Sequence, residues 1–180
     1  MGTWATFVLA RTATPLDSFT PLTERDEGLV ADQAFAEGWH LGQYEDSYLF
    51  DERADVLPDL HRLTSAPTII AFVADSDYAL VEGLDGHGRF RVCIGYLAAA
   101  EEAETAGPDW EGYVPNPEVE GAVLAWAEAA GLFPSREKIS NILARTEAVD
   151  IEGDWTPAEL VLMELCRALG LQVESDTAAG

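Results

Sequence analysis

Apolar and polar positions in the first part of the chain predict strands separated by helices. Residues 3–10 and 39–44 are rich in side chains that favour strands. Residues 68–74 form a near-continuous apolar run, as is typical of a central strand covered on both faces. Helical spacing of apolar side chains predicts helices at about 24–36 and 55–64. The expected order here is therefore strand, helix, strand, helix, strand.

Residues 78–95 carry the clearest pairing pattern of the chain. The segments "YALVEGL" and "RFRVCIG" flank "DGHG", and Asp-Gly is favoured in tight turns. A hairpin closed at that turn places Glu82 opposite Arg91, an opposite-charge pair on the more polar face, and Phe90 over Gly83. The charged and apolar positions agree on this one register, and a shift by one residue would disturb both.

Helical spacing continues through the rest of the chain. A helix is expected near 96–106, a second after Asn116 and a third after Ser135. The last helix has the clearest start, because "TPAE" places Thr156 at the capping position and Glu159 where a capping box requires it.

These elements predict the α+β class. The expected fold is a mixed, partly antiparallel sheet of about five strands (β-α-β-α-β-β-β), followed by a C-terminal segment of three to four helices. We expect residues 1–107 to form the sheet region, residues 116–172 to form a helical region packed on it in a single compact domain, and residues 173–180 to form a flexible tail.

Charge narrows the range of partners. The chain has 33 acidic and 10 basic residues, for a formal net charge of -23. It lacks the stripe of Lys and Arg that binding to nucleic acid requires, and anionic membranes are equally poor partners. A basic protein is the favoured partner, although the same charge also serves solubility alone.

Cysteine use and hydropathy indicate a cytoplasmic protein. Cys93 and Cys166 form no CxxC motif and sit among apolar neighbours, so we expect them to be core residues in a reducing compartment. No apolar segment approaches the length of a membrane span, and the first residues lack the pattern of a signal peptide.

The stretch "TIIAFVADSDYALVEG" (68–83) raises the question of enzymatic chemistry. An apolar strand that ends at Asp75 and Asp77 resembles the nucleophile strand of a haloacid-dehalogenase-like phosphatase. The helix that should follow is replaced by the predicted hairpin, and Lys138 is the only lysine available to screen a phosphate. We therefore interpret the acids as a polar turn. A metal-dependent hydrolase that uses Asp75 and Asp77 is the alternative.

Other chemistry is not indicated. The chain has no nucleotide-binding motif, and its histidines lack metal-ligand spacing, so we predict no catalytic residue and no cofactor. A small-ligand pocket between the sheet and the C-terminal helices is a third hypothesis.

Acidic side chains around two aromatic residues predict a partner-binding segment. Residues 92–135 contain eight acids and no base. Aromatic anchors within an anionic surface are typical of a protein that binds a basic protein, although the same aromatics could fold back onto the core. The predicted contact residues are Trp110, Tyr113, Glu101, Glu102, Glu104, Asp109 and Glu111.

The segments "MGTWATFVLART", "ADSD" and "AWAEAAGL" together resemble a group of small acidic actinobacterial proteins of unassigned function. The resemblance implies no activity and no site residues. In size, acidity and absence of catalytic motifs the chain is also similar to bacterial immunity proteins and antitoxins, which bind basic toxins. By that analogy the expected function is non-catalytic binding of a basic protein, possible forms being an immunity-like protein or a DNA mimic.

Overall fold

The computed structural model describes residues 2–23, 28–45, 48–95, 117–144 and 156–173. Six strands form one sheet in the order β2-β3-β1-β4-β5-β6, and every neighbouring pair is antiparallel. The strands are β1 (Ala5–Arg11), β2 (Leu29–Phe35), β3 (Trp39–Tyr44), β4 (Thr68–Ala74), β5 (Tyr78–Leu84) and β6 (Arg89–Gly95). The α+β class is therefore confirmed.

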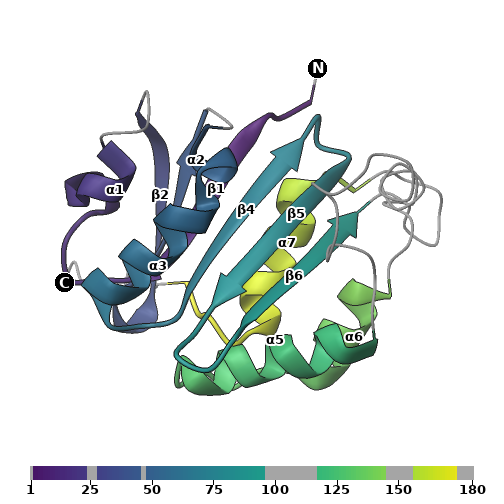
Figure 1. Ribbon diagram of the computed structural model, residues 1–180. Coiled ribbons are helices and arrows are strands. Elements are labelled where there is room, and N and C mark those ends of the chain that lie inside the picture. The colour runs from purple at the N-terminus through teal and green to yellow at the C-terminus, as the bar shows by residue number, and fades with distance from the viewer. Residues whose placement is uncertain (1, 24–27, 46–47, 96–116, 145–155, 174–180) are drawn as a thin grey trace, which may run out of the picture.

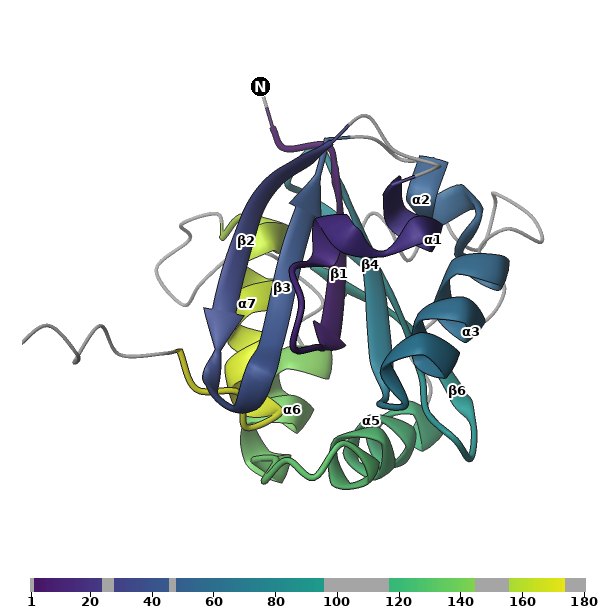
Figure 2. The same cartoon turned by 90° about the vertical axis from the view of Figure 1, so that its left-hand side faces the viewer.

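Helices cover both faces of the sheet (Figures 1 and 2). The short helices η1 (Leu16–Ser18), α1 (Thr20–Thr23) and α2 (Tyr48–Asp51) lie with α3 (Arg53–Thr64) on one side, here called the α3 face. The other side, the α7 face, is covered by α5 (Pro117–Ala129), α6 (Arg136–Leu143) and α7 (Ala158–Ala168). No helix of the described ranges has the length and apolar character needed to cross a membrane.

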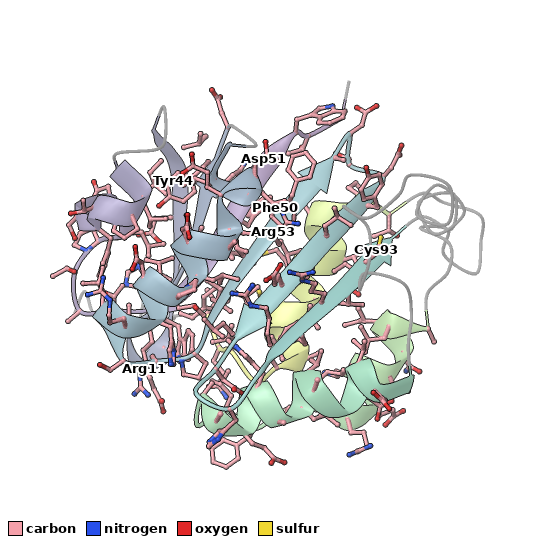
Figure 3. All side chains as sticks on the ribbon, viewed as in Figure 1. Arg11, Tyr44, Phe50, Asp51, Arg53 and Cys93 are labelled. Atoms are coloured by element: carbon pink, nitrogen blue, oxygen red, sulfur yellow. The ribbon has the colours of Figure 1, made fainter. Side chains whose placement is uncertain are left out.

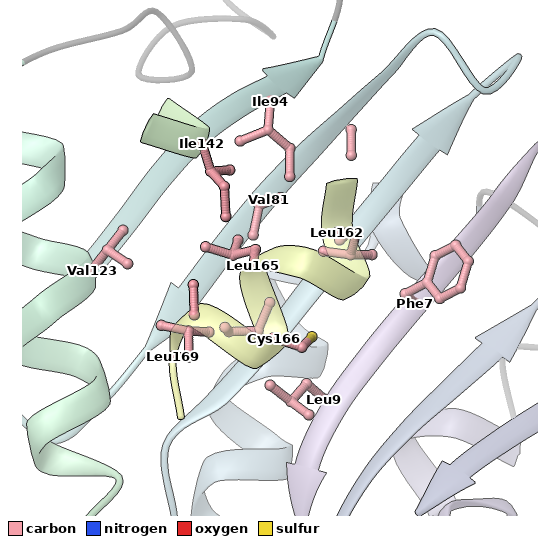
Figure 4. Close-up of a cluster of buried hydrophobic side chains, with 14 of the residues drawn as sticks. Phe7, Leu9, Val81, Ile94, Val123, Ile142, Leu162, Leu165, Cys166 and Leu169 are labelled. Carbon is pink, nitrogen blue, oxygen red and sulfur yellow. The ribbon is translucent and has the colours of Figure 1, made fainter. Parts of the chain in front are cut away.

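The α7 face holds the larger apolar core. Figure 4 shows side chains of β1, β5 and β6 meeting those of the three C-terminal helices. The labelled members of this cluster are Phe7, Leu9, Val81, Ile94, Val123, Ile142, Leu162, Leu165, Cys166 and Leu169. A second, smaller core on the α3 face is built around Leu16, Tyr44 and Leu57. Because β4 contributes to both cores, it is the doubly covered central strand that its apolar run predicts.

The predicted hairpin register is confirmed. Glu82 pairs with Arg91, and Gly83 pairs with Phe90 in the β5–β6 ladder. A Cβ atom on Gly83 would lie only 2.1 Å from the Phe90 ring, so the ring does cover bare backbone. At the turn, the Asp85 carboxylate accepts hydrogen bonds from the backbone N–H groups of His87 and Gly88, at 2.6 and 2.7 Å. Short-range turn chemistry thus fixes the pairing of both strands.

The helix predicted at about 24–36 is wrong. Residues 29–35 form the edge strand β2, which pairs with β3, and a single turn, η2 (Ala36–Gly38), connects them. Most side chains of β2 are exposed, so the segment has little apolar pattern from which a strand could be predicted. Pairing with the strongly patterned β3 overrides its local preference. The sheet consequently has six strands rather than five.

Candidate functional site

The predicted contact residues between Glu101 and Tyr113 lie outside the residues that the structure describes. The assignment of Trp110 and Tyr113 as anchors for a basic partner therefore stays a prediction. The other candidates, Asp75, Asp77, the cysteines and the histidines, all lie in described segments.

The two aspartates of "ADSD" occupy a turn between β4 and β5, as the turn interpretation predicts. Asp75 and Ser76 have φ values of 49° and 60°, in the left-handed region that Asp tolerates better than most residues. The exposed Asp75 carboxylate accepts a hydrogen bond from the Gly2 backbone N–H at 2.9 Å. The residue that follows Asp77 begins a strand, not the helix that a phosphatase of this type requires.

Ser76 fastens this turn to two other parts of the chain. Its buried hydroxyl accepts a hydrogen bond from the Thr3 backbone N–H at 2.7 Å and donates one to the Glu159 carboxylate at 3.1 Å. Thr3 Oγ1 donates to the same carboxylate oxygen at 3.1 Å. The Ser76 carbonyl accepts from the Ala158 N–H at the start of α7. The turn is therefore a junction between β1, β5 and α7.

The same contacts correct the predicted capping box at the start of α7. The helix begins at Ala158 with Pro157 at the capping position, so Thr156 lies one residue too early to cap it, and the cap has no side-chain hydrogen bond. Glu159 reaches Thr3 and Ser76 instead. A long-range contact has thus replaced the local one that the sequence pattern suggests.

The two cysteines are at least partly buried, and His40 and His61 each contact a polar group of the chain. Burial raises the pKa of Cys93 and of Cys166 from 9.0 to about 12, so neither thiol is activated as a nucleophile. His61 contacts the Ala66 carbonyl at 2.8 Å, and His40 pairs with Asp32 at 3.1 Å. Within the described ranges, no three His, Cys, Asp or Glu side chains are grouped closely enough to hold a metal ion.

The larger core lies between the sheet and the C-terminal helices (Figure 4). Recesses do occur outside it, for example one of about 310 Å³ between α6 and α7. Its lining combines Lys138 and Arg167 with Glu164, so it has no strong excess of either charge. A recess of about 210 Å³ lies between the β5–β6 turn and α5, with His87 and Trp126 in its lining, so the hypothesis of a ligand pocket between the sheet and the C-terminal helices stays a prediction.

A cluster of three arginines around Glu82 is the most unusual polar feature of the described residues. Glu82 is fully buried, on the α3 face of β5. Arg53 of α3 and Arg91 of β6 each donate from Nε to its Oε2, at 3.1 and 3.2 Å. Arg89 Nη1 lies 2.9 Å from Oε1, oriented as an ion pair rather than as a well-aligned hydrogen bond. These four residues are called the arginine cluster below.

Packing and register position the arginine cluster. Arg89 and Arg91 are two residues apart on β6, so both point to the α3 face on which Glu82 lies. The Arg53 guanidinium lies 4.3 Å from the centre of the Phe50 ring and donates to the Phe50 carbonyl, which fixes its approach from α3 (Figure 3). Among the described residues, three guanidinium groups thus surround one buried carboxylate.

Sequence reasoning found only part of the arginine cluster. The hairpin register predicts the pair of Glu82 and Arg91, and strand alternation alone could have added Arg89. No local pattern connects Arg53 to this site, because α3 reaches the strand only through the tertiary fold.

An aromatic row adjoins the arginine cluster. The Trp4 and Phe72 rings lie 5.9 Å apart, and the Phe72 and Phe50 rings 5.7 Å apart, between ring centres. Trp4 is 59% exposed at the outer end of the row. Aromatic and arginine side chains thus share one continuous part of the α3 face.

Comparison of the chain with family models, with curated proteins and with solved structures gives no match.

Proposed function

We propose that this chain is a non-catalytic protein that binds a basic protein partner through its anionic surface. The observation that carries the proposal is the distribution of charge around α2 and α3. Asp51, Glu52 and Asp55 are exposed there, and Asp17 of the adjacent η1 is exposed as well. The arginines of α3 offset this charge only in part, because Arg53 contacts the buried Glu82 and Arg62 contacts Asp59.

Long-range electrostatics support this kind of partner. A net charge of -23 attracts a cationic surface before contact and raises the rate of productive encounter. Binding of this kind requires no catalytic group. A basic toxin nuclease is one partner with suitable chemistry, and an immunity-like or DNA-mimic protein would present such a surface to it.

The test is surface-based binding kinetics with basic proteins purified from the native host on the immobilised chain. We expect the association rate to fall steeply between 0.05 and 0.5 M salt, since the screening length shrinks from about 10 Å at 0.1 M to about 3 Å at 1 M. An Asp51→Asn/Asp55→Asn variant should bind more slowly, whereas a Glu37→Gln/Glu137→Gln variant, altered at the exposed positions of η2 and α6, should match the native chain.

The predicted anchors are tested in the same experiment. Replacing Trp110 or Tyr113 with Ala should raise the dissociation rate and leave the association rate almost unchanged, because an anchor acts only after contact. The proposal fails if no basic protein binds. It also fails if every basic protein binds with the same salt dependence and the two double variants have the same association rate.

A further inference from the structure

Two cationic side chains on the C-terminal helices stand apart from the other cations that the structure describes. Within the described ranges, every other Lys or Arg side chain forms an ion pair with a carboxylate. Lys138 of α6 and Arg167 of α7 form none there, and both are exposed. The chain has 33 acidic and only 10 basic residues, so two cations without an acidic partner are unexpected, and both line the same recess.

Helix geometry directs these side chains into the groove between α6 and α7. A backbone hydrogen bond joins the start of α6 to the end of α7. Lys138 lies in the first turn of α6 and Arg167 in the last turn of α7, so both lie near this junction. Lys138 and Asn141 are three residues apart on α6, as are Glu164 and Arg167 on α7. Each pair therefore projects from one side of its helix towards the recess of about 310 Å³.

The described lining of this recess suits an anionic head group attached to an apolar body. The Arg167 guanidinium can donate to two oxygens at once, and the Lys138 ammonium adds a point charge with three donors. Asn141 supplies an amide N–H, and Ile142, which is 3% exposed, supplies an apolar surface. Glu164 leaves only a small positive excess, so short-range contacts rather than long-range attraction would select the ligand.

We propose that the recess between α6 and α7 binds a small organic anion, namely a molecule with one phosphate or carboxylate head group and a short apolar body. The head group lies between Lys138 and Arg167 and accepts a hydrogen bond from Asn141, and the body packs on Ile142. The volume of the recess is that of a small ligand site. The recess is formed by helices of the α7 face, whereas the surface proposed for a basic partner surrounds α2 and α3, so neither proposal depends on the other.

The test uses a property of the sequence, because Lys138 is the only lysine of the chain. Lysine labelled with ¹³C at Cε therefore gives one side-chain NMR signal, and that signal reports on this recess alone. Phenyl phosphate, phenylacetate, inorganic phosphate and benzyl alcohol are titrated separately into the full chain at constant pH and about 0.15 M ionic strength.

We expect phenyl phosphate or phenylacetate to shift the Lys138 signal until the shift saturates. The tighter binder of these two identifies the preferred head group. Inorganic phosphate should bind severalfold more weakly than phenyl phosphate, because it lacks the ring that packs on Ile142. Benzyl alcohol should leave the signal unchanged, because it carries no charge for the two cations to bind.

Matched variants locate the site. Arg167→Gln should weaken binding of the tighter anion by about tenfold, the loss expected for one charge-assisted contact. Arg136→Gln makes the same change of net charge on α6, where Arg136 pairs with Glu120, and should leave the affinity unchanged.

A second pair of variants should act in the opposite direction. Glu164→Gln removes an acid from the lining and should tighten binding severalfold, since the carboxylate repels an anionic ligand. Glu137→Gln alters an exposed acid of α6 outside the described lining and should have no such effect. Thermal melting of each variant checks that it is folded.

Three results would overturn the proposal. The first is a Lys138 signal that neither phenyl phosphate nor phenylacetate shifts to saturation. The second is an equal effect of Arg167→Gln and Arg136→Gln in folded variants, which would indicate non-specific charge. The third is binding of inorganic phosphate as tight as that of phenyl phosphate, which would mean that the recess holds an adventitious ion only.

Discussion

The strands β5 and β6 present two contrasting surfaces. On the α7 face, Val81, Val92 and Ile94 are buried beneath α5 and α7 in an apolar core. On the α3 face, the same strands carry Glu82, Arg89 and Arg91, and helix α3 adds Arg53. Apolar packing is non-directional and tolerates local rearrangement, whereas a buried ion cluster requires each of its members. One face of the hairpin is therefore stabilised by apolar packing and the other by a buried ion cluster.

The largest expected effect comes from removing the central aromatic of the α7 face. Trp126 packs on Trp39 and Phe90, and its indole N–H donates to the Thr68 and Leu84 carbonyls at 3.2 and 3.1 Å. Trp126→Ala should lower the free energy of unfolding by about 3–5 kcal/mol, measured by urea denaturation.

Trp126→Phe tests how that loss is divided between packing of the aromatic ring and the hydrogen bonds of the indole N–H. It keeps an aromatic ring but removes the indole N–H, so about 1–3 kcal/mol should be lost. Equal losses for Trp126→Ala and Trp126→Phe would contradict a face stabilised mainly by packing.

Removing Glu82 tests the other face. Glu82→Gln leaves three arginines around a neutral amide and should lower the free energy of unfolding by about 3 kcal/mol. Glu120→Gln breaks the exposed pair with Arg136, whose nitrogen lies 2.7 Å from the carboxylate, and should cost less than about 1 kcal/mol. Comparable small losses in both variants would show that the arginine cluster is solvated like an ordinary surface pair.

The two faces also differ in how far the sequence predicts them. Alternation along 78–95 predicts the hairpin, its register and the apolar side chains of the α7 face, because all depend on neighbours within one hairpin. The pattern cannot indicate that α3 brings Arg53 to Glu82, nor that Glu159 contacts Ser76, since these contacts depend on how distant elements pack. The edge strand β2 is mispredicted for a different reason, because most of its side chains are exposed and leave little apolar pattern.

A smaller effect is expected at the turn that begins β5. Ser76→Ala removes the hydrogen bonds to Thr3 and Glu159 and should lower the free energy of unfolding by about 1–2 kcal/mol. Asp75→Asn keeps an oxygen acceptor for the Gly2 N–H, so its effect should stay within about 0.5 kcal/mol. A larger loss for Asp75→Asn than for Ser76→Ala would reverse the assignment of the residue that holds the turn. Hydrolase turnover that disappears in Asp75→Asn would revive the alternative enzymatic function.

The smallest expected effect uses one thiol on each face. Cys166 is buried on the α7 face and Cys93 is half-buried on the α3 face of β6, and burial raises the pKa of each from 9.0 to about 12. A raised folded-state pKa means that the native chain holds these protons more tightly than the unfolded chain. Their contribution to stability is therefore complete below pH 9 and falls as the pH rises from 9 towards 12.

The contribution of each thiol to the free energy of unfolding should be about 1 kcal/mol smaller at pH 10 than at pH 8. This follows from a limiting slope of about 1.4 kcal/mol per pH unit above the unfolded-state pKa. Urea denaturation of the native chain, Cys93→Ala and Cys166→Ala in reducing buffer at pH 8 and pH 10 measures this loss. A variant without the thiol does not undergo this loss. The free energy of unfolding of the variant, relative to that of the native chain, should therefore rise by about 1 kcal/mol from pH 8 to pH 10. The rise should appear for Cys166→Ala because the α7 face excludes water. Its absence for Cys93→Ala alone would mean that water reaches the α3 face at β6, and would sharpen the contrast between the two surfaces of the hairpin.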